Sequence, residues 1–254
     1  MSDDRPVPTD SWAALRRFTP ARIALGRAGP GWPTREVLSF GLAHARARDA
    51  VHQPLDADAL EFELRRAGYA PLRAHSAAPD RATYLARPDL GRKLDAASAA
   101  RLDAARGNPE LLVAIEDGLS ALAAQRHVPP LLTALRERAP ARWAGLPVVI
   151  GVQGRVALGD AIGERLGARF VVVLIGERPG LSSPDSLGAY LTHAPRIGCS
   201  DAERNCVSNI RPEGLGYAPA AWKIDWLVGE GLRRGVTGVA LKDESESGTA
   251  SLPR

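Results

Sequence analysis

Hydrophobic residues follow two different spacings along this chain, and the spacing changes near residue 107. Before the change they recur every three or four positions, as Leu60, Leu64 and Ala67 do after Asp56, a residue placed to cap a helix. This pattern is typical of helices that bury one face. We therefore expect a helical N-terminal region over residues 1–106.

The first helix of that region is expected to begin at Thr34, which can cap it, after a cluster of Pro and Gly residues. Leu38, Leu42 and Ala45 would then fall on one side of the helix. A third helical stretch runs from about Asp95 to a Gly-Asn-Pro tripeptide, which we take as the domain boundary.

After the boundary, short apolar runs at 111–115, 147–152 and 170–175 alternate with amphipathic stretches. This alternation is typical of βαβ units and a parallel sheet. The fold class predicted for residues 107–241 is therefore α/β, a Rossmann-like and mostly parallel domain. Residues 242–254 are polar and are expected to form a disordered tail.

Two prolines and two tryptophans lead to more local predictions. Pro129 and Pro130 are expected to divide one crossover into two pieces, because proline interrupts the helical hydrogen-bond ladder. Trp222 and Trp226 lie four residues apart on a late helix that begins near Pro219. They are read as core or interface residues, with the core favoured.

Composition narrows the class of protein. With 45% hydrophobic and 24% charged residues, the chain of 254 residues can bury a core, so global disorder is excluded. The net charge of +4 does not come from a block of basic residues, which disfavours nucleic acid as a partner.

No apolar segment is long enough to span a bilayer, so a cytoplasmic protein is expected. Cys199 and Cys206 have neither disulfide-framework nor zinc-site spacing, and no metal ligands are assigned.

Polar, glycine-containing loops follow each of the three predicted strands. Their sequences are EDG at 116–118, QGRV at 153–156 and GERPG at 176–180. Ligands of open parallel sheets bind beyond the carboxyl ends of the strands, so a binding crevice is expected where these loops meet. His193 is the one histidine expected near it, and alone it is more often structural than catalytic.

Signatures of common enzymes of this fold class are missing. The chain has no G-x-G-x-x-G, no P-loop motif and no G-x-S-x-G elbow. No catalytic residue is therefore assigned within the chain.

Several strings, in order, resemble one family. They are ARIALGR at 21–27, RPDLGR at 87–92, IEDGLS at 115–120, GERPGLSSPDSL at 176–187 and AERNCVSNI at 202–210. From about Leu15 to Leu241 the chain resembles the small (light) subunit of adenosylcobalamin-dependent ethanolamine ammonia-lyase. The strings carry this resemblance, which periodicity and spacing alone would not have indicated.

The resemblance implies a division of labour between two subunits. The substrate pocket would belong to the (β/α)₈ barrel of a large subunit, and adenosylcobalamin would be held where the two subunits meet. The complex would deaminate ethanolamine to acetaldehyde and ammonia. The family's cobalamin contacts, carried over position by position, are Val156, Glu177 and Cys206 of this chain.

Each of these three residues also has a purely structural interpretation. Val156 could pack at a helix start, and Cys206 could be a buried small hydrophobe. Glu177 needs a partner, which could be Arg178 or an amide of the corrin ring.

One missing pattern bears on how the cofactor would be bound. The chain lacks the D-x-H-x-x-G pattern of proteins that place a histidine on cobalt, which fits a cofactor that keeps its own dimethylbenzimidazole there. Some family members have a longer N-terminal segment and are packaged in a bacterial microcompartment, and packaging stays open for this chain. The alternative functions are a scaffold subunit without cofactor contact and a free-standing α/β nucleotide-binding enzyme.

Overall fold

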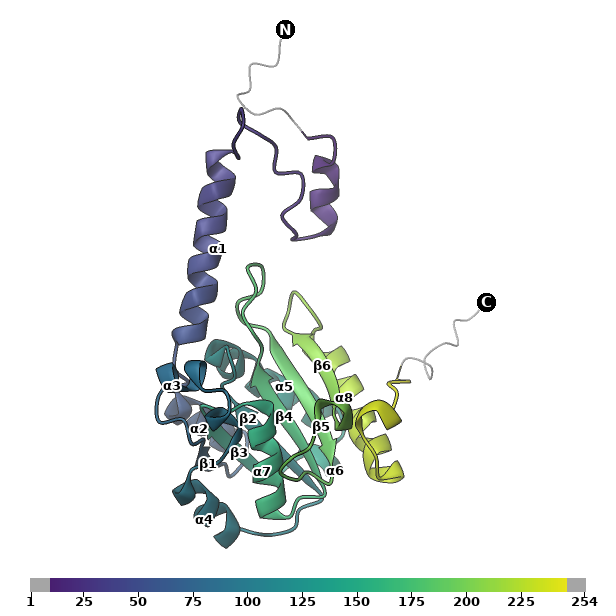
Figure 1. The fold of residues 1–254 in the computed structure, drawn as a ribbon. Helices are drawn as coiled ribbons and strands as arrows, with labels where there is room; N and C mark the ends of the chain where they lie inside the picture. The colour runs from purple at the N-terminus through teal and green to yellow at the C-terminus, as the bar shows by residue number, and fades with distance from the viewer. Residues whose placement is uncertain (1–9, 246–254) are drawn as a thin grey trace, which may run out of the picture.

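The structure of the protein is a computed structural model that describes residues 10–245 (Figure 1). Within these residues the chain forms one six-stranded sheet with the strand order β1-β3-β2-β4-β5-β6. The strands are β1 (Leu72–His75), β2 (Leu111–Glu116), β3 (Val148–Val152), β4 (Phe170–Gly176), β5 (Leu187–His193) and β6 (Asn205–Ile210). The first four are parallel to one another, and β5 and β6 add antiparallel pairs at one edge. The α/β class is confirmed, with a mixed sheet.

Helices cover both faces of this sheet. The α-helices of the described residues are α1 (Thr34–His52), α2 (Ala57–Arg66), α3 (Arg81–Ala86), α4 (Ala96–Ala104), α5 (Ala121–Arg138), α6 (Pro140–Trp143), α7 (Val156–Leu166) and α8 (Tyr217–Arg234). Between residues 10 and 245 the chain also forms 3₁₀ helices at Ala13–Phe18, Leu90–Arg92, Asp201–Glu203 and Gly238–Ala240. Side chains of α2, α5, α6 and α8 build the larger core on one face, and α4 and α7 build the second core on the other. The central strands are therefore buried on both sides, which explains their continuous apolar runs.

Side-chain caps fix the start of several helices. Asp56 accepts a hydrogen bond from the backbone N–H of Ala59 at 2.9 Å, which confirms its predicted capping of α2. Asp95 caps α4 in the same way. Helix α1 does begin at Thr34, but Pro33 occupies the capping position and no side chain caps this end. The predicted start is thus correct, while the capping role of Thr34 is wrong.

The region expected to be helical contains the edge strand β1. Only Ala74 of its four residues is buried, so the segment lacks the apolar run that marks the other strands. Its pairing with β3 gives it strand structure, from Leu72 beside Val149 to His75 beside Val152. Residues 1–106 are therefore not helical throughout, because a tertiary contact decides the conformation of this short segment.

Helix α5 runs unbroken through Pro129 and Pro130, so the predicted division of this crossover is wrong. The prolines remove two backbone donors, and the hydroxyl of Thr133 donates to the carbonyl of Pro129 at 3.0 Å. The helix also buries an apolar face that includes Leu131 and Leu135 against the sheet. Packing of this face maintains the helix across the proline pair.

Helix α1 extends away from the sheet, and the 3₁₀ helix at Ala13–Phe18 lies near its far end (Figure 1). Only Glu36 and Ala50 of its 19 residues are buried. The side that carries Leu38 and Leu42 is exposed, at 68% and 53% of their surface, so it packs against no core in this chain.

Helix α8 closes the larger core, and both of its tryptophans are half-buried. Trp226 packs against that core, as favoured by the sequence. Trp222 lies under the guanidinium of Arg138 and donates to the carbonyl of Ser245 at 3.2 Å. Residues 242–245 of the expected tail are thus placed, and 246–254 lie outside the described residues.

Candidate functional site

The loops after β2, β3 and β4 meet at one edge of the sheet, as predicted. The buried carboxylate of Asp117 accepts hydrogen bonds from the backbone N–H groups of Gln153, at 3.0 Å, and Gly154, at 2.8 Å. The backbone N–H of Leu119 donates to the carbonyl of Gly176 at 3.0 Å. These contacts join the loop after β2 to both of its neighbours, so the edge has one fixed shape.

The RPDLGR string packs against the loop after β3. The backbone N–H of Arg155 donates to the carbonyl of Gly91 at 2.9 Å, and the Tyr84 hydroxyl donates to the carbonyl of Gly154 at 3.0 Å. The Arg155 guanidinium lies 4.3 Å from the centre of the Tyr84 ring, a cation–π contact. Its Nε is buried without a hydrogen-bond partner, which leaves one donor at this edge unsatisfied.

Two adjoining pockets lie at this edge, with volumes of about 250 Å³ and about 750 Å³. Arg155, Val156 and Tyr190 form part of both walls, so the two pockets lie side by side, and together we call them the hollow. Partial burial and the neighbouring Cys206 raise the pKa of Tyr190, which keeps its phenol protonated. Sequence analysis missed Tyr190, although the alternating residues of 187–193 could have indicated a strand there.

Val156 and Glu177 both line these pockets. Val156 is the first residue of α7 and lines both pockets, while Glu177 follows β4 and lines the smaller one. Oε2 of Glu177 accepts from the Ser186 hydroxyl at 2.6 Å and from the backbone N–H of Asn209 at 3.2 Å. The interpretation that Arg178 is the partner of Glu177 is therefore wrong.

Cys206 lies next to the same hollow but outside the walls of both pockets. It sits on β6 directly opposite Tyr190 of β5, and its Sγ is 3.2 Å from the Ser208 hydroxyl. The residue is exposed, so the interpretation of Cys206 as a buried small hydrophobe is wrong. Of the three carried-over residues, the structure places two in the pocket walls and the third one strand away.

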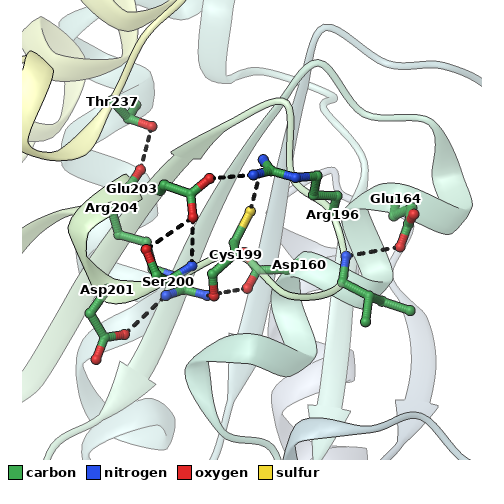
Figure 2. A network of polar contacts seen from close by, with 10 residues as sticks. Asp160, Glu164, Arg196, Cys199, Ser200, Asp201, Glu203, Arg204 and Thr237 are labelled. Atoms are coloured by element: carbon green, nitrogen blue, oxygen red, sulfur yellow. Dashed lines mark hydrogen bonds and ion pairs between the residues drawn. The ribbon is translucent and has the colours of Figure 1, made fainter.

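The far wall of the larger pocket is held by a buried ion pair, shown in Figure 2. Arg204 of the loop before β6 contacts Asp160 of α7, and these side chains are only 4% and 1% exposed. Arg204 also donates to the carboxylate of Asp201, at 2.9 Å, and to the carbonyl of Cys199, at 2.8 Å. The pair therefore fixes the loop that carries Cys199 to the helix that begins at Val156.

His193 lies at the opposite edge of the sheet, contrary to the expectation that it approaches the crevice. It ends β5, and because β5 is antiparallel to β4 it pairs with Phe170, the first residue of β4. No strand is predicted over 187–193, and the antiparallel direction of β5 places its last residue away from the carboxyl ends of β2, β3 and β4.

Beneath the crevice, the carboxyl group of Glu116 is fully buried, and neither of its oxygens has a hydrogen-bond partner. It fills the space beside Gly154 and Gly159, where a Cβ on Gly154 would lie 2.9 Å from Glu116 Cδ. Burial, followed by the nearby charges of Asp117 and Asp160, raises the pKa of Glu116 well above its usual value, while Arg204 opposes this shift. Its surroundings therefore favour the protonated, uncharged form of the carboxyl group.

Replacing Glu116 with glutamine is expected to remove a pH-dependent destabilisation. A carboxyl whose pKa is raised in the folded state contributes its stability below the unfolded pKa of about 4.3 and loses it as pH rises toward the folded value. Relative to that of the wild type, the free energy of unfolding of Glu116→Gln should therefore increase by up to about 1.4 kcal/mol for each pH unit across this window. Urea unfolding between pH 5 and pH 8 measures the difference. Glu110→Gln, at an exposed position, is the control, and a pH-independent difference for Glu116→Gln would contradict the assignment.

Two further findings concern classes of site. Among residues 10–245, no group of histidine, cysteine, aspartate and glutamate side chains is arranged to hold a metal ion. No helix in this part of the chain is both long and apolar enough to cross a membrane.

Known proteins similar to this chain agree on one family. The family model described as "Ethanolamine ammonia-lyase light chain" matches residues 9–242. A protein of Ralstonia nicotianae named "Ethanolamine ammonia-lyase small subunit" is 57% identical over 251 residues, covering 96% of this chain and 93% of that protein. A protein of the same name from Azotobacter vinelandii is 57% identical, and the match covers 97% of this chain and 93% of that protein. A third, from Pseudomonas syringae pv. tomato, is 53% identical, and the match covers 97% of this chain and 88% of that protein. With the family model spanning nearly all of its length, the chain belongs to the family of ethanolamine ammonia-lyase small subunits.

Proposed function

We propose that this chain is the small subunit of an ethanolamine ammonia-lyase and helps to bind adenosylcobalamin at its interface with the large subunit. The complex would convert ethanolamine to acetaldehyde and ammonia. The observation that carries the proposal is the convergence of four separate sequence strings on one hollow, whose walls include Val156 and Glu177.

The residues around the hollow fit a corrin cofactor. The edge of a corrin ring carries amide groups, which both donate and accept hydrogen bonds. Oε1 of Glu177 makes no hydrogen bond within the described residues and can accept from such an amide. The guanidinium group of Arg155, a residue that lines both pockets, carries the complementary donors. Val156 and the ring of Tyr190 offer apolar surface beside these polar groups, as is usual in cofactor sites.

In this function the chain binds and orients the cofactor. Adenosylcobalamin would supply the chemistry, since homolysis of its cobalt–carbon bond starts the radical reaction. Val156 and Glu177 would contact the corrin from two neighbouring loops, and Cys206 would approach it from β6. The Asp117 and Arg204 contacts keep these elements in register, so the site can be ready before the cofactor arrives.

Two other functions are less well supported. A scaffold subunit without cofactor contact would leave the hollow lined by Val156 and Glu177 without an occupant. A free-standing enzyme would need a catalytic set at this edge, yet the histidine expected there lies at the opposite edge of the sheet.

The test is deamination of ethanolamine by the separate and combined subunits. We expect no turnover by this chain with adenosylcobalamin alone, and turnover when the large subunit is added. An aldehyde-coupled assay measures it, with each subunit alone as control. Turnover by the purified small chain would contradict the division of labour.

A further inference from the structure

Large exposed hydrophobic side chains are concentrated in residues 10–52, which we name the N-terminal arm. Eight of the twelve such side chains found in residues 10–245 belong to it. They are Trp12, Leu15, Phe18, Trp32, Val37, Leu38, Phe40 and Leu42. Isolated exposed hydrophobic residues are ordinary, but a group of this size on one projecting segment marks a surface that another molecule covers.

The first half of α1 shows how that surface is covered. At 100° per residue, Val37, Leu38, Phe40 and Leu42 spread over about 200° of the helix circumference. A helix lying on a flat surface needs an apolar stripe of only about 100°. Apolar side chains over twice that arc indicate a helix enclosed on several sides, as in a groove.

The charge of the arm specifies the groove further. It carries seven arginines and three acidic residues, Asp10, Glu36 and Asp49, so its net charge of +4 equals that of the whole chain. Two such arms would repel each other, which disfavours pairing between arms of two copies of this chain. A groove that is apolar at its base and acidic at its rim complements the arm.

The arm also lies beside the loop that carries Glu177. Arg46 and Leu42 of α1 line a small hollow together with Leu181 and Pro184, which belong to the loop that begins at Glu177. Leu181 is itself an exposed hydrophobic residue. A partner that covers the cofactor-binding edge can therefore extend directly onto the arm.

We propose that the N-terminal arm inserts into an apolar groove with an acidic rim on the large subunit and supplies much of the binding energy of the complex. This inference rests on the proposed function for the identity of the partner. The arm adds an anchor outside the cofactor site, with Leu38 and Leu42 among the buried contacts and the arginines at the rim.

The test compares affinities for the large subunit by sedimentation or surface-based titration. The double variant Leu38→Glu with Leu42→Glu is expected to bind about 30-fold more weakly or worse, because it places charges in a desolvated contact. Val239→Glu is the matched control, since Val239 is an exposed hydrophobic residue, at 82%, outside the arm. The control should bind within about twofold of the wild type. Circular dichroism and melting of the isolated chains check that both variants remain folded.

A second pair of residues tests the acidic rim. Arg27→Glu with Arg48→Glu is expected to weaken binding and to flatten the salt dependence between 50 and 500 mM NaCl, since exposed charge pairs are screened by salt. Wild-type affinity that does not fall with salt would contradict an acidic rim.

The outcomes separate this inference from the proposed function. Binding of the Leu38→Glu, Leu42→Glu variant within about twofold of the wild type would overturn the arm as an anchor. Self-association of the isolated chain that this variant abolishes would overturn it in favour of a second copy. In either case, cobalamin binding by the wild-type complex would still support the proposed function. A wild-type complex that forms but binds no cobalamin would refute the proposed function and leave the arm as an anchor.

Discussion

A reconstituted complex that carries Glu177→Gln is expected to bind cobalamin about tenfold to a hundredfold more weakly than the wild type. The substitution keeps the volume of the side chain and removes the charge that strengthens its hydrogen bonds. A hydrogen bond to a charged group contributes about 1.5–3 kcal/mol, which corresponds to this loss of affinity. The titration should use hydroxocobalamin, with kcat measured at saturating adenosylcobalamin.

The controls separate binding from chemistry and from folding. Glu110→Gln removes a carboxylate just before β2, at the edge of the sheet opposite the pockets, and should leave the cobalamin Kd unchanged. Because Glu177 also accepts from Ser186 and Asn209, the melting temperature of the variant must be compared with that of the wild type. Cys206→Ser should have a smaller effect on Kd and spare kcat. An unchanged Kd with a collapsed kcat for Glu177→Gln would show that Glu177 acts in the reaction and not in binding.

Replacing Arg204 with methionine is expected to destabilise the chain by about 3–5 kcal/mol at pH 7, because it leaves a buried carboxylate without its cation. Asp160 is 1% exposed, and burial already raises its pKa against the opposing effect of Arg204. Without Arg204 the carboxyl must take up a proton or remain as an unpaired buried charge. Urea unfolding monitored by tryptophan fluorescence measures the loss.

A matched surface pair shows whether burial is the cause. Arg169→Met breaks an ion pair with Glu110 in which both side chains are more than half exposed, and it should cost less than about 1 kcal/mol. The double variant Asp160→Asn with Arg204→Met should be more stable than Arg204→Met alone, since it no longer buries an unpaired charge. A loss of under about 1 kcal/mol for Arg204→Met would mean that water reaches this pair.

The central part of the fold was predictable because its residues carry local signals. The three buried strands follow from apolar runs, and α2 follows from helical spacing and from Asp56 at its start. The loops that end these strands, and hence Val156 and Glu177, could be assigned to one edge from strand order alone. Their identification as cofactor contacts came from the resemblance.

The errors arise where contacts distant in sequence decide the structure. Nothing local shows that 187–193 runs antiparallel to β4, so His193 was expected at the wrong edge and Tyr190 was missed. The strand β1 forms only because β3 lies beside it. Helix α1 follows the expected spacing, yet its apolar residues face outward, since periodicity indicates an apolar side without telling which molecule covers it.

Equilibrium binding of hydroxocobalamin to the small chain, to the large subunit and to their complex tests the central claim most directly. If the cofactor is held between the two subunits, the complex should bind it at least about tenfold more tightly than either subunit alone, since each offers only part of the contacts. Glu177→Gln in the small chain should reduce that gain. Equal affinity of the large subunit with and without this chain would contradict a cofactor-binding role for the small subunit.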